Sequence, residues 1–80
     1  MQDGKEMDYD ALCEEAARAV SKSSYSQTQL ANEFGVSTGA VSRALSESGP
    51  KFSRLQRRVL ERLTPYQIEE HVVFRAKSDD

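Results

Sequence analysis

The stretch QTQLANEFGVSTGAVSRAL, residues 27–45, restricts what this chain can fold into more than any other part of the sequence. Two short patterns of helical period meet there at Gly35, and glycine ends a helix in the left-handed conformation at little cost. Ala31 lies one helical turn before the glycine and is small enough to let a second helix approach closely. The sequence therefore predicts two helices joined by a tight turn.

Both helices of this pair have start signals. Ser26, followed three positions later by Gln29, is typical of a capping box, and Ser37 can cap the second helix. The motif is predicted to span residues 26–46, with its second helix over 37–46. The inner, apolar stripe of that second helix consists of Ala40, Val41, Ala44 and Leu45.

Two further helices are expected around this motif. Apolar residues at helical spacing predict one helix over residues 8–22 and another over residues 52–63. Gly49 and Pro50 are expected to stop the second helix of the motif, and Thr64-Pro65 to stop the last helix. The predicted fold is therefore mainly α, with four short helices.

The apolar pattern changes its period after the last helix. Over residues 66–76, Ile68, Val72 and Phe74 fall on one side at an even spacing, which predicts a β-strand. One strand cannot satisfy its own backbone groups, so pairing with the same strand of a second copy is the economical solution. The three apolar residues are then dimerisation residues. The alternative is that this segment continues as helix or packs irregularly.

Composition sets the class of protein. A chain of 80 residues with 38% hydrophobic and 30% charged residues forms one small domain. No apolar run approaches the roughly 20 residues of a membrane span, the N-terminus lacks signal-peptide features, and the one cysteine allows no intrachain disulfide. We expect a cytoplasmic protein without a membrane partner. Residues 1–7 are expected to be a flexible start and 78–80 a disordered end.

Charge is divided unevenly along the chain, although its formal net value is −2. Residues 1–20 carry six acidic and two basic side chains, whereas residues 21–63 carry three acidic and seven basic ones. A basic middle of this kind can face phosphate groups. The alternative is an ordinary solvated surface of mixed charge.

The residues outside the apolar stripe of the second helix are polar and mostly short, as base edges in a DNA groove require. The planar guanidinium of Arg43 can pair bidentately with guanine, Thr38 can hydrogen-bond a base, and Gly39 allows close approach. Hydroxyl groups that could donate to phosphate belong to Ser26, Thr28 and Ser37. The side chains predicted to neutralise phosphate charge belong to Lys51, Arg54, Arg57 and Arg58.

The segment QTQLANEFGVSTGAVSRALSESG resembles the helix-turn-helix of phage Cro and repressor proteins, the lambda-repressor-like family. The likeness covers residues 26–51, about a third of the chain. The matching positions are Gln27-Thr28, Ala31, Gly35-Val36, Ala40-Val41 and Ala44-Leu45. The basic helix predicted over 52–63 departs from the pattern, because a lambda-type Cro would already be in its sheet there.

The resemblance implies a role for each matched position. Thr38, Gly39, Ser42 and Arg43 fall where the family's recognition helix meets base edges. Gln27 falls where the first helix touches the DNA backbone, and Lys51 where a basic residue approaches phosphate or a base. Residues 8–64 would then form the DNA-binding domain and residues 65–77 the dimerisation element.

The function expected from these observations is sequence-specific binding of double-stranded DNA by a homodimeric transcriptional regulator. Two alternatives are a protein-interaction module that keeps the helix-turn-helix shape and an accessory or antitoxin-type subunit. No enzyme, cofactor, metal or small-molecule substrate is expected. Cys13 lies on an apolar helix stripe, where a buried structural thiol is the simpler interpretation, and His71 has no second metal ligand nearby.

Overall fold

The computed structural model describes residues 6–70, and residues 1–5 and 71–80 lie outside that description. Its helices are α1 (Tyr9–Lys22), α2 (Gln27–Phe34), α3 (Thr38–Ala44) and α4 (Pro50–Leu63). The prediction of a mainly helical fold is confirmed, and the part of the chain that is described contains no strand. None of the helices over residues 6–70 is both long and apolar enough to cross a bilayer.

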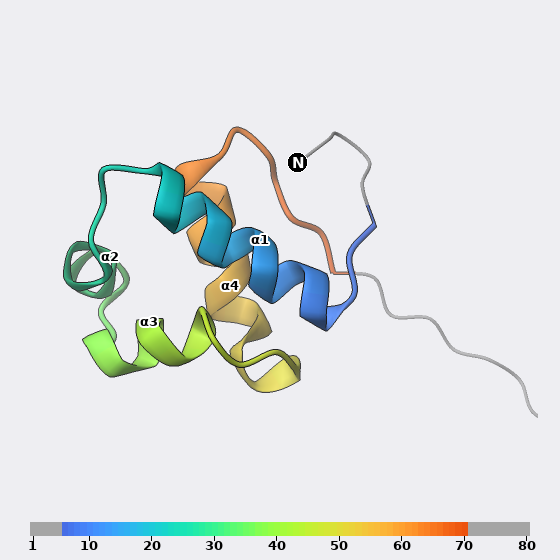
Figure 1. Ribbon diagram of the computed structural model, residues 1–80, viewed down its shortest axis with the longest axis horizontal. Coiled ribbons are helices and arrows are strands. Elements are labelled where there is room, and N and C mark those ends of the chain that lie inside the picture. Colours follow the sequence, from blue (N-terminus) through green and yellow to red (C-terminus); the bar gives the residue numbers. More distant parts are fainter. Residues whose placement is uncertain (1–5, 71–80) are drawn as a thin grey trace, which may run out of the picture.

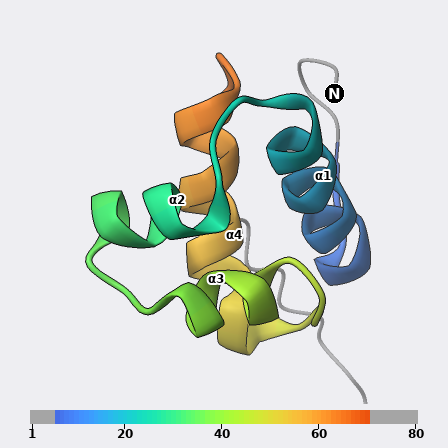
Figure 2. The same cartoon turned by 60° about the vertical axis from the view of Figure 1, so that its left-hand side comes forward.

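The helices form two pairs. The longer pair is α1 and α4, which pack against each other, while α2 packs against α3 and α3 also reaches α4. Figure 1 shows α2 nearly end-on and α3 lying in the plane of the view, so the axes of these two short helices run in very different directions. Figure 2 shows α2 and α1 on opposite sides of α4, with α3 at the lower end of α4.

Local capping explains where the first two helices begin. The Asp8 carboxylate accepts a hydrogen bond from the Ala11 amide at 2.8 Å and starts α1. The predicted capping box of α2 is present: Ser26 Oγ accepts from the Gln29 amide at 3.1 Å, and Gln29 Oε1 accepts from the Ser26 amide at 2.7 Å. Such reciprocal bonds satisfy amides that have no partner inside the helix.

The turn between α2 and α3 has the predicted left-handed glycine. Gly35 has φ 68° and ψ 33°, and the Val36 amide donates to the Ala31 carbonyl at 3.0 Å. Ser37 Oγ then accepts from the Ala40 amide at 3.0 Å. Ser37 is thus the cap before α3, so the prediction of a helix over 37–46 is corrected to 38–44.

The turn that follows α3 explains why the helix ends early. Both the Ser46 and Glu47 amides donate to the Arg43 carbonyl, at 3.1 and 2.8 Å. Gly49, with φ 118°, precedes α4 directly. Pro50 is the first residue of α4, where its missing amide hydrogen costs no helical bond. The last helix therefore begins at 50 rather than at the predicted 52.

Two apolar clusters make up the core. Leu12 and Ala16 of α1 meet Val59 and Leu60 of α4 in the first cluster. The second cluster joins α2 to α3 through Leu30, Ala31 and Val41. The residues that pack against both clusters, and so connect the helix pairs, are Val20, Phe34, Leu45 and Leu63.

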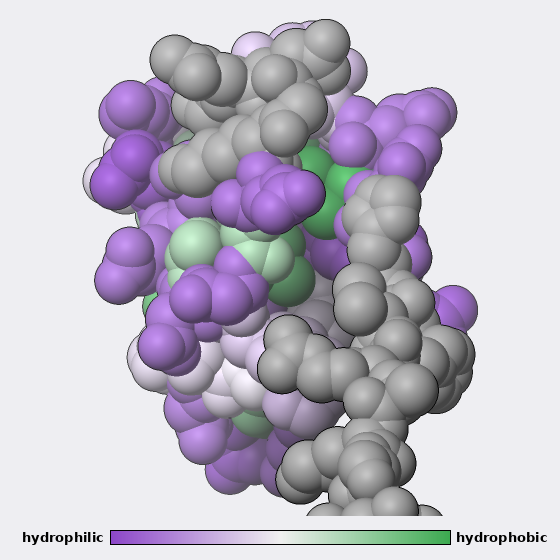
Figure 3. Space-filling view, turned by 90° about the vertical axis from the view of Figure 1, so that its right-hand side faces the viewer, coloured by the Kyte–Doolittle hydropathy of each residue, from purple (hydrophilic) through white to green (hydrophobic). Residues whose placement is uncertain are grey.

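The chain turns back after Thr64 and runs past α1 (Figure 1). The predicted strand over 66–76 is wrong for residues 66–70, which are not in a strand, and residues 71–76 lie outside the described part. Ile68 explains the difference. Its side chain packs on the α1–α4 core, its amide donates to Glu61 Oε2 at 2.9 Å, and its carbonyl accepts from Arg57 Nε at 3.2 Å. Figure 3 shows hydrophobic surface among hydrophilic side chains on this face.

The left-handed turn can be tested by Gly35→Ala. A side chain in this conformation costs about 1–2 kcal/mol, and no atom lies within 4 Å of a Cβ built at Gly35. We therefore expect the free energy of unfolding in urea to fall by about 1–2 kcal/mol from the backbone penalty alone.

Gly39→Ala is the matched control. Gly39 lies within α3, and a Cβ there would meet only Ser37 Oγ, at 3.9 Å. Alanine is the better helix former by roughly 1 kcal/mol, so this variant should unfold at higher urea concentration than the unsubstituted chain. The same loss of stability in both variants would contradict the assigned turn.

Candidate nucleic-acid interface

The outer face of α3 is the part of the molecule that the sequence assigned to base contacts. Thr38, Gly39, Ser42 and Arg43 are all exposed. Val41 and Ala44 of the same helix are completely buried. The helix therefore separates its two faces sharply: the apolar residues hold it to the core, and every residue predicted to contact a base lies at the surface.

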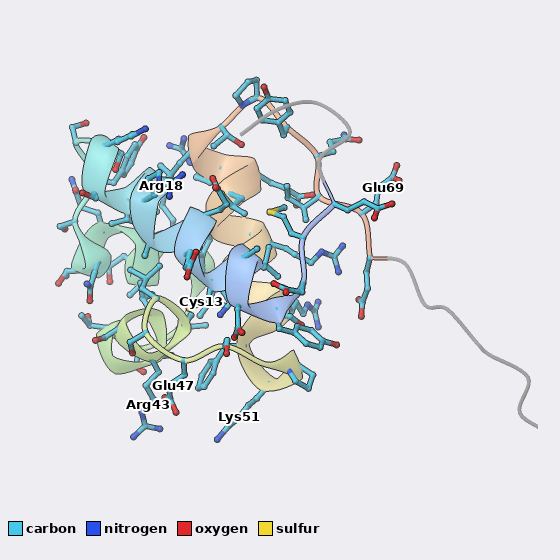
Figure 4. The ribbon with its side chains drawn as sticks, turned by 45° about the vertical axis from the view of Figure 1, so that its right-hand side comes forward. Cys13, Arg18, Arg43, Glu47, Lys51 and Glu69 are labelled. Atoms are coloured by element: carbon cyan, nitrogen blue, oxygen red, sulfur yellow. The ribbon has the colours of Figure 1, made fainter. Side chains whose placement is uncertain are left out.

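Arg43 is the longest side chain on this face. Its guanidinium makes no hydrogen bond or ion pair with any residue in the range 6–70. Figure 4 shows Arg43 and Lys51 extending from the same end of the molecule, although one belongs to α3 and the other to α4. Glu47, in the turn between those helices, is exposed on the same end and brings one negative charge to it.

Lys51 and Arg54 belong to the first two turns of α4 and are both exposed. The Lys51 ammonium lies 5.4 Å from the centroid of the neighbouring Phe52 ring. Gly49, the residue that caps α4, offers no side-chain acceptor to the first amides of the helix. The cationic side chains and the positive end of the helix dipole thus coincide at this point.

Arg57 and Arg58, also predicted to contact phosphate, engage other parts of the protein. Arg57 donates through Nε to the Ile68 carbonyl at 3.2 Å and pairs with Glu70 at 3.1 Å. The Arg58 guanidinium lies 4.7 Å above the Phe34 ring and donates to the Phe34 carbonyl at 3.5 Å. Their role at DNA stays a prediction, but each would have to leave or share these partners.

Arg62 completes a group of arginines from α4 that hold α2 or the C-terminal segment. Its guanidinium lies 4.7 Å above the Tyr25 ring, donates to the Tyr25 hydroxyl and pairs with Glu33 at 3.0 Å. The hydrogen bond and negative charge of Glu33 raise the pKa of Arg62 above its ordinary value. The positive charge here is thus balanced locally by an acidic residue.

The hydroxyl groups predicted to touch the DNA backbone lie at the starts of α2 and α3. Ser26, Thr28 and Ser37 are exposed, and Gln27 is half-buried. The oxygens of Ser26 and Ser37 already accept capping hydrogen bonds. Because a hydroxyl can donate while it accepts, both groups keep a hydrogen for a phosphate oxygen.

Gln56 is the polar residue whose importance the sequence did not reveal. It is completely buried, and its Nε2 donates to the carbonyls of Ala44 at 2.8 Å and Glu47 at 2.9 Å. The signal in the sequence was its spacing: Gln56 lies one turn before Val59 and Leu60, on the side of α4 that faces the core. A polar residue at such a position needs internal partners.

Cys13 contacts the same carbonyl from α1. The residue is only 7% exposed, and its thiol lies 3.5 Å from the Ala44 carbonyl oxygen, to which it donates. Burial, followed by the negative charges of Asp10 and Glu14, raises the pKa of this thiol. The group is thus protonated and structural, in agreement with its place on the apolar stripe.

No group of three or more potential metal ligands comes together within residues 6–70. Val72 and Phe74, predicted to form the dimer contact, lie outside that range. Ile68, the third member, is half-buried against its own core.

Comparisons with protein-family models, curated proteins and solved structures gave no match to this chain. The resemblance to Cro and repressor proteins thus stays a prediction carried by the residues of the motif.

The buried thiol leads to a pH-dependent prediction. Because the pKa of Cys13 is raised in the folded state, the unfolded chain loses this proton at a lower pH than the folded chain does. The protonated thiol therefore contributes to the free energy of unfolding. This contribution is complete below the ordinary thiol pKa of about 8.5 and is lost as the pH rises above it. Urea unfolding at several pH values between 7 and 10 would show this loss.

Cys13→Ala separates this titration from that of other groups. The variant lacks the packed sulfur and should be less stable than the unsubstituted chain at pH 7. Without the thiol, its stability should fall less between pH 8 and pH 10, so the difference between the two proteins narrows. If the difference in the free energy of unfolding between the two proteins stays constant with pH, Cys13 ionises equally in the folded and unfolded states.

Proposed function

We propose that this protein is a sequence-specific double-stranded-DNA-binding transcriptional regulator of the helix-turn-helix class, which acts as a homodimer. The observation that carries the proposal is the two-sided character of α3. Its inner side is fixed by the completely buried Val41 and Ala44. Its outer side presents Thr38, Ser42 and Arg43 to solvent, and Arg43 forms no ion pair within residues 6–70.

The major groove is the surface that such a helix fits. The groove is wide enough for one α-helix and displays a different pattern of donors and acceptors for each base pair. Arg43 would donate two hydrogen bonds to guanine, while Thr38 and Ser42 would reach neighbouring base edges. Gly39, which has no side chain, would let the helix backbone approach the bases.

Phosphate contacts would come from both sides of this helix. Lys51 and Arg54 are exposed on α4, and Arg43 and Lys51 extend from one end of the molecule (Figure 4). Hydroxyl groups at the start of α2 would add neutral donors. Because Arg57 and Arg62 are paired with Glu70 and Glu33, fewer cations remain for DNA than the seven in the basic middle of the sequence suggest.

A homodimer would place two copies of α3 in successive major grooves. Dimeric proteins of this class read half-sites about 34 Å apart, one turn of DNA. The proposed dimer contact includes the C-terminal apolar residues Val72 and Phe74. Sedimentation at high micromolar concentration without DNA tests the dimer, and a mass equal to a single chain would contradict it.

A helix-turn-helix protein-interaction module is the second candidate function. Glu47 favours it, because an exposed carboxylate at the same end as Arg43 would oppose phosphate. The net charge of −2 points in the same direction. A salt titration distinguishes the two functions, since affinity for DNA falls steeply with salt as condensed counterions are released. Absence of binding to any duplex at about 50 mM salt with micromolar protein would favour the protein-interaction function.

Arg43→Ala and Lys51→Gln should affect DNA binding in different ways. Selection from random duplexes first supplies the preferred site. Loss of Arg43 should then remove discrimination at one base pair per half-site, worth about 1–3 kcal/mol. Loss of Lys51 should weaken binding to all sequences alike and reduce the salt slope by about one.

Arg62→Gln is the charge-matched control. It removes the same single charge, but from a guanidinium already held by Glu33 and Tyr25. We expect a smaller change in salt slope than for Lys51→Gln. Equal slopes for these two variants would mean that the phosphate-facing surface has been assigned to the wrong side of the molecule.

A further inference from the structure

Gln56 connects the body of the protein to the end of α3. Both hydrogen bonds from Nε2 end on one short piece of chain, at the Ala44 carbonyl and the Glu47 carbonyl, 2.8 and 2.9 Å away. Ala44 is the last residue of α3, and Glu47 lies in the turn that leads to α4. One buried carboxamide therefore fixes the position at which α3 stops and the next connection starts.

The carbonyls at a helix C-terminus have no partner within the helix and must find one elsewhere. In α3 the Ala44 carbonyl finds its partner in Gln56, assisted by the Cys13 thiol 3.5 Å from the same oxygen. Helices α1 and α4 thus both hold this one carbonyl. Because α3 has only seven residues, it cannot maintain its orientation through its own hydrogen bonds.

The two hydrogen bonds of Gln56 come with a cost inside the same side chain. The second polar atom of the side chain, Gln56 Oε1, is buried without a hydrogen-bond partner in the described part of the chain. A buried acceptor without a partner is destabilising and offsets part of what the two donated bonds contribute. An apolar residue of similar volume would avoid that cost but would leave the Ala44 and Glu47 carbonyls without their Gln56 donor.

We propose that Gln56 is the positioning residue for DNA readout: it fixes the position of Arg43 relative to Lys51 across the turn between α3 and α4. Arg43 precedes Ala44 directly, and Lys51 follows the same turn in the first turn of α4. This inference rests on the proposed function. A bidentate contact to guanine tolerates little displacement, whereas a phosphate contact tolerates more.

Gln56→Met tests the proposal, because methionine keeps the length and volume of the side chain and lacks its donors. We expect the ratio of affinities for the selected site and a scrambled duplex to fall about tenfold, which corresponds to about 1.4 kcal/mol. The salt slope should stay unchanged, since the number of phosphate contacts is the same. Binding is measured where circular dichroism shows each variant to be fully folded.

Leu60→Met serves as the control. It alters a buried position of the same helix, in the α1–α4 core, and it should keep the ratio of affinities of the unsubstituted protein. If Gln56→Met does not fold, Gln56→Leu replaces it as the donor-free variant. A folded, donor-free variant with an unchanged ratio would overturn the proposal.

Hydrogen exchange gives a second readout that needs no DNA. The Ser46 and Glu47 amides both donate to the Arg43 carbonyl, and they should exchange about tenfold faster in the donor-free variant, while the α1 and α4 amides keep their protection. Unchanged exchange at these two amides would contradict the positioning role. Failure of the unsubstituted protein to prefer any duplex would instead contradict the proposed function, so the two failures are distinguishable.

Discussion

The shortness of α2 and α3 is the constraint on which the rest of this structure depends. Helices of eight and seven residues are well below the length that is stable alone in water. Each must therefore be held at its ends and along one face by the remainder of the chain. Serine caps hold the starts, Gly35 fixes the turn between them, and the buried amide of Gln56 holds the last carbonyl of α3.

The same constraint explains how α4 uses its charged residues. Arg58 and Arg62 lie over the aromatic rings of Phe34 and Tyr25, next to the two ends of α2. Exposed contacts of this kind contribute about 0.5–1 kcal/mol each, which is useful to a short helix with two buried apolar residues. Arginine serves here because its planar guanidinium can stack and donate hydrogen bonds at once.

Basic residues consequently divide into two groups. Arg57, Arg58 and Arg62 have partners within the protein, whereas Arg43 and Arg54 make no ion pair within residues 6–70. A count of charges along the sequence cannot make this division. It depends on which side of α4 faces α2 and the returning C-terminal segment, and that is a property of the packed molecule.

The local features could be predicted from the sequence: the capping box of α2, the left-handed Gly35, the Ser37 cap and the apolar stripes of four helices. Each depends on residues a few positions apart, whose chemistry is legible without the fold. The packing of the helices was needed to show that Ile68 returns to its own core instead of extending a strand, that Gln56 holds the end of α3, and which arginines of α4 pair with acidic residues. These outcomes join residues that are distant along the chain, such as Arg62 and Glu33 or Cys13 and Ala44. Such partners are defined only when the helices have packed, because burial and distance, not spacing, select them.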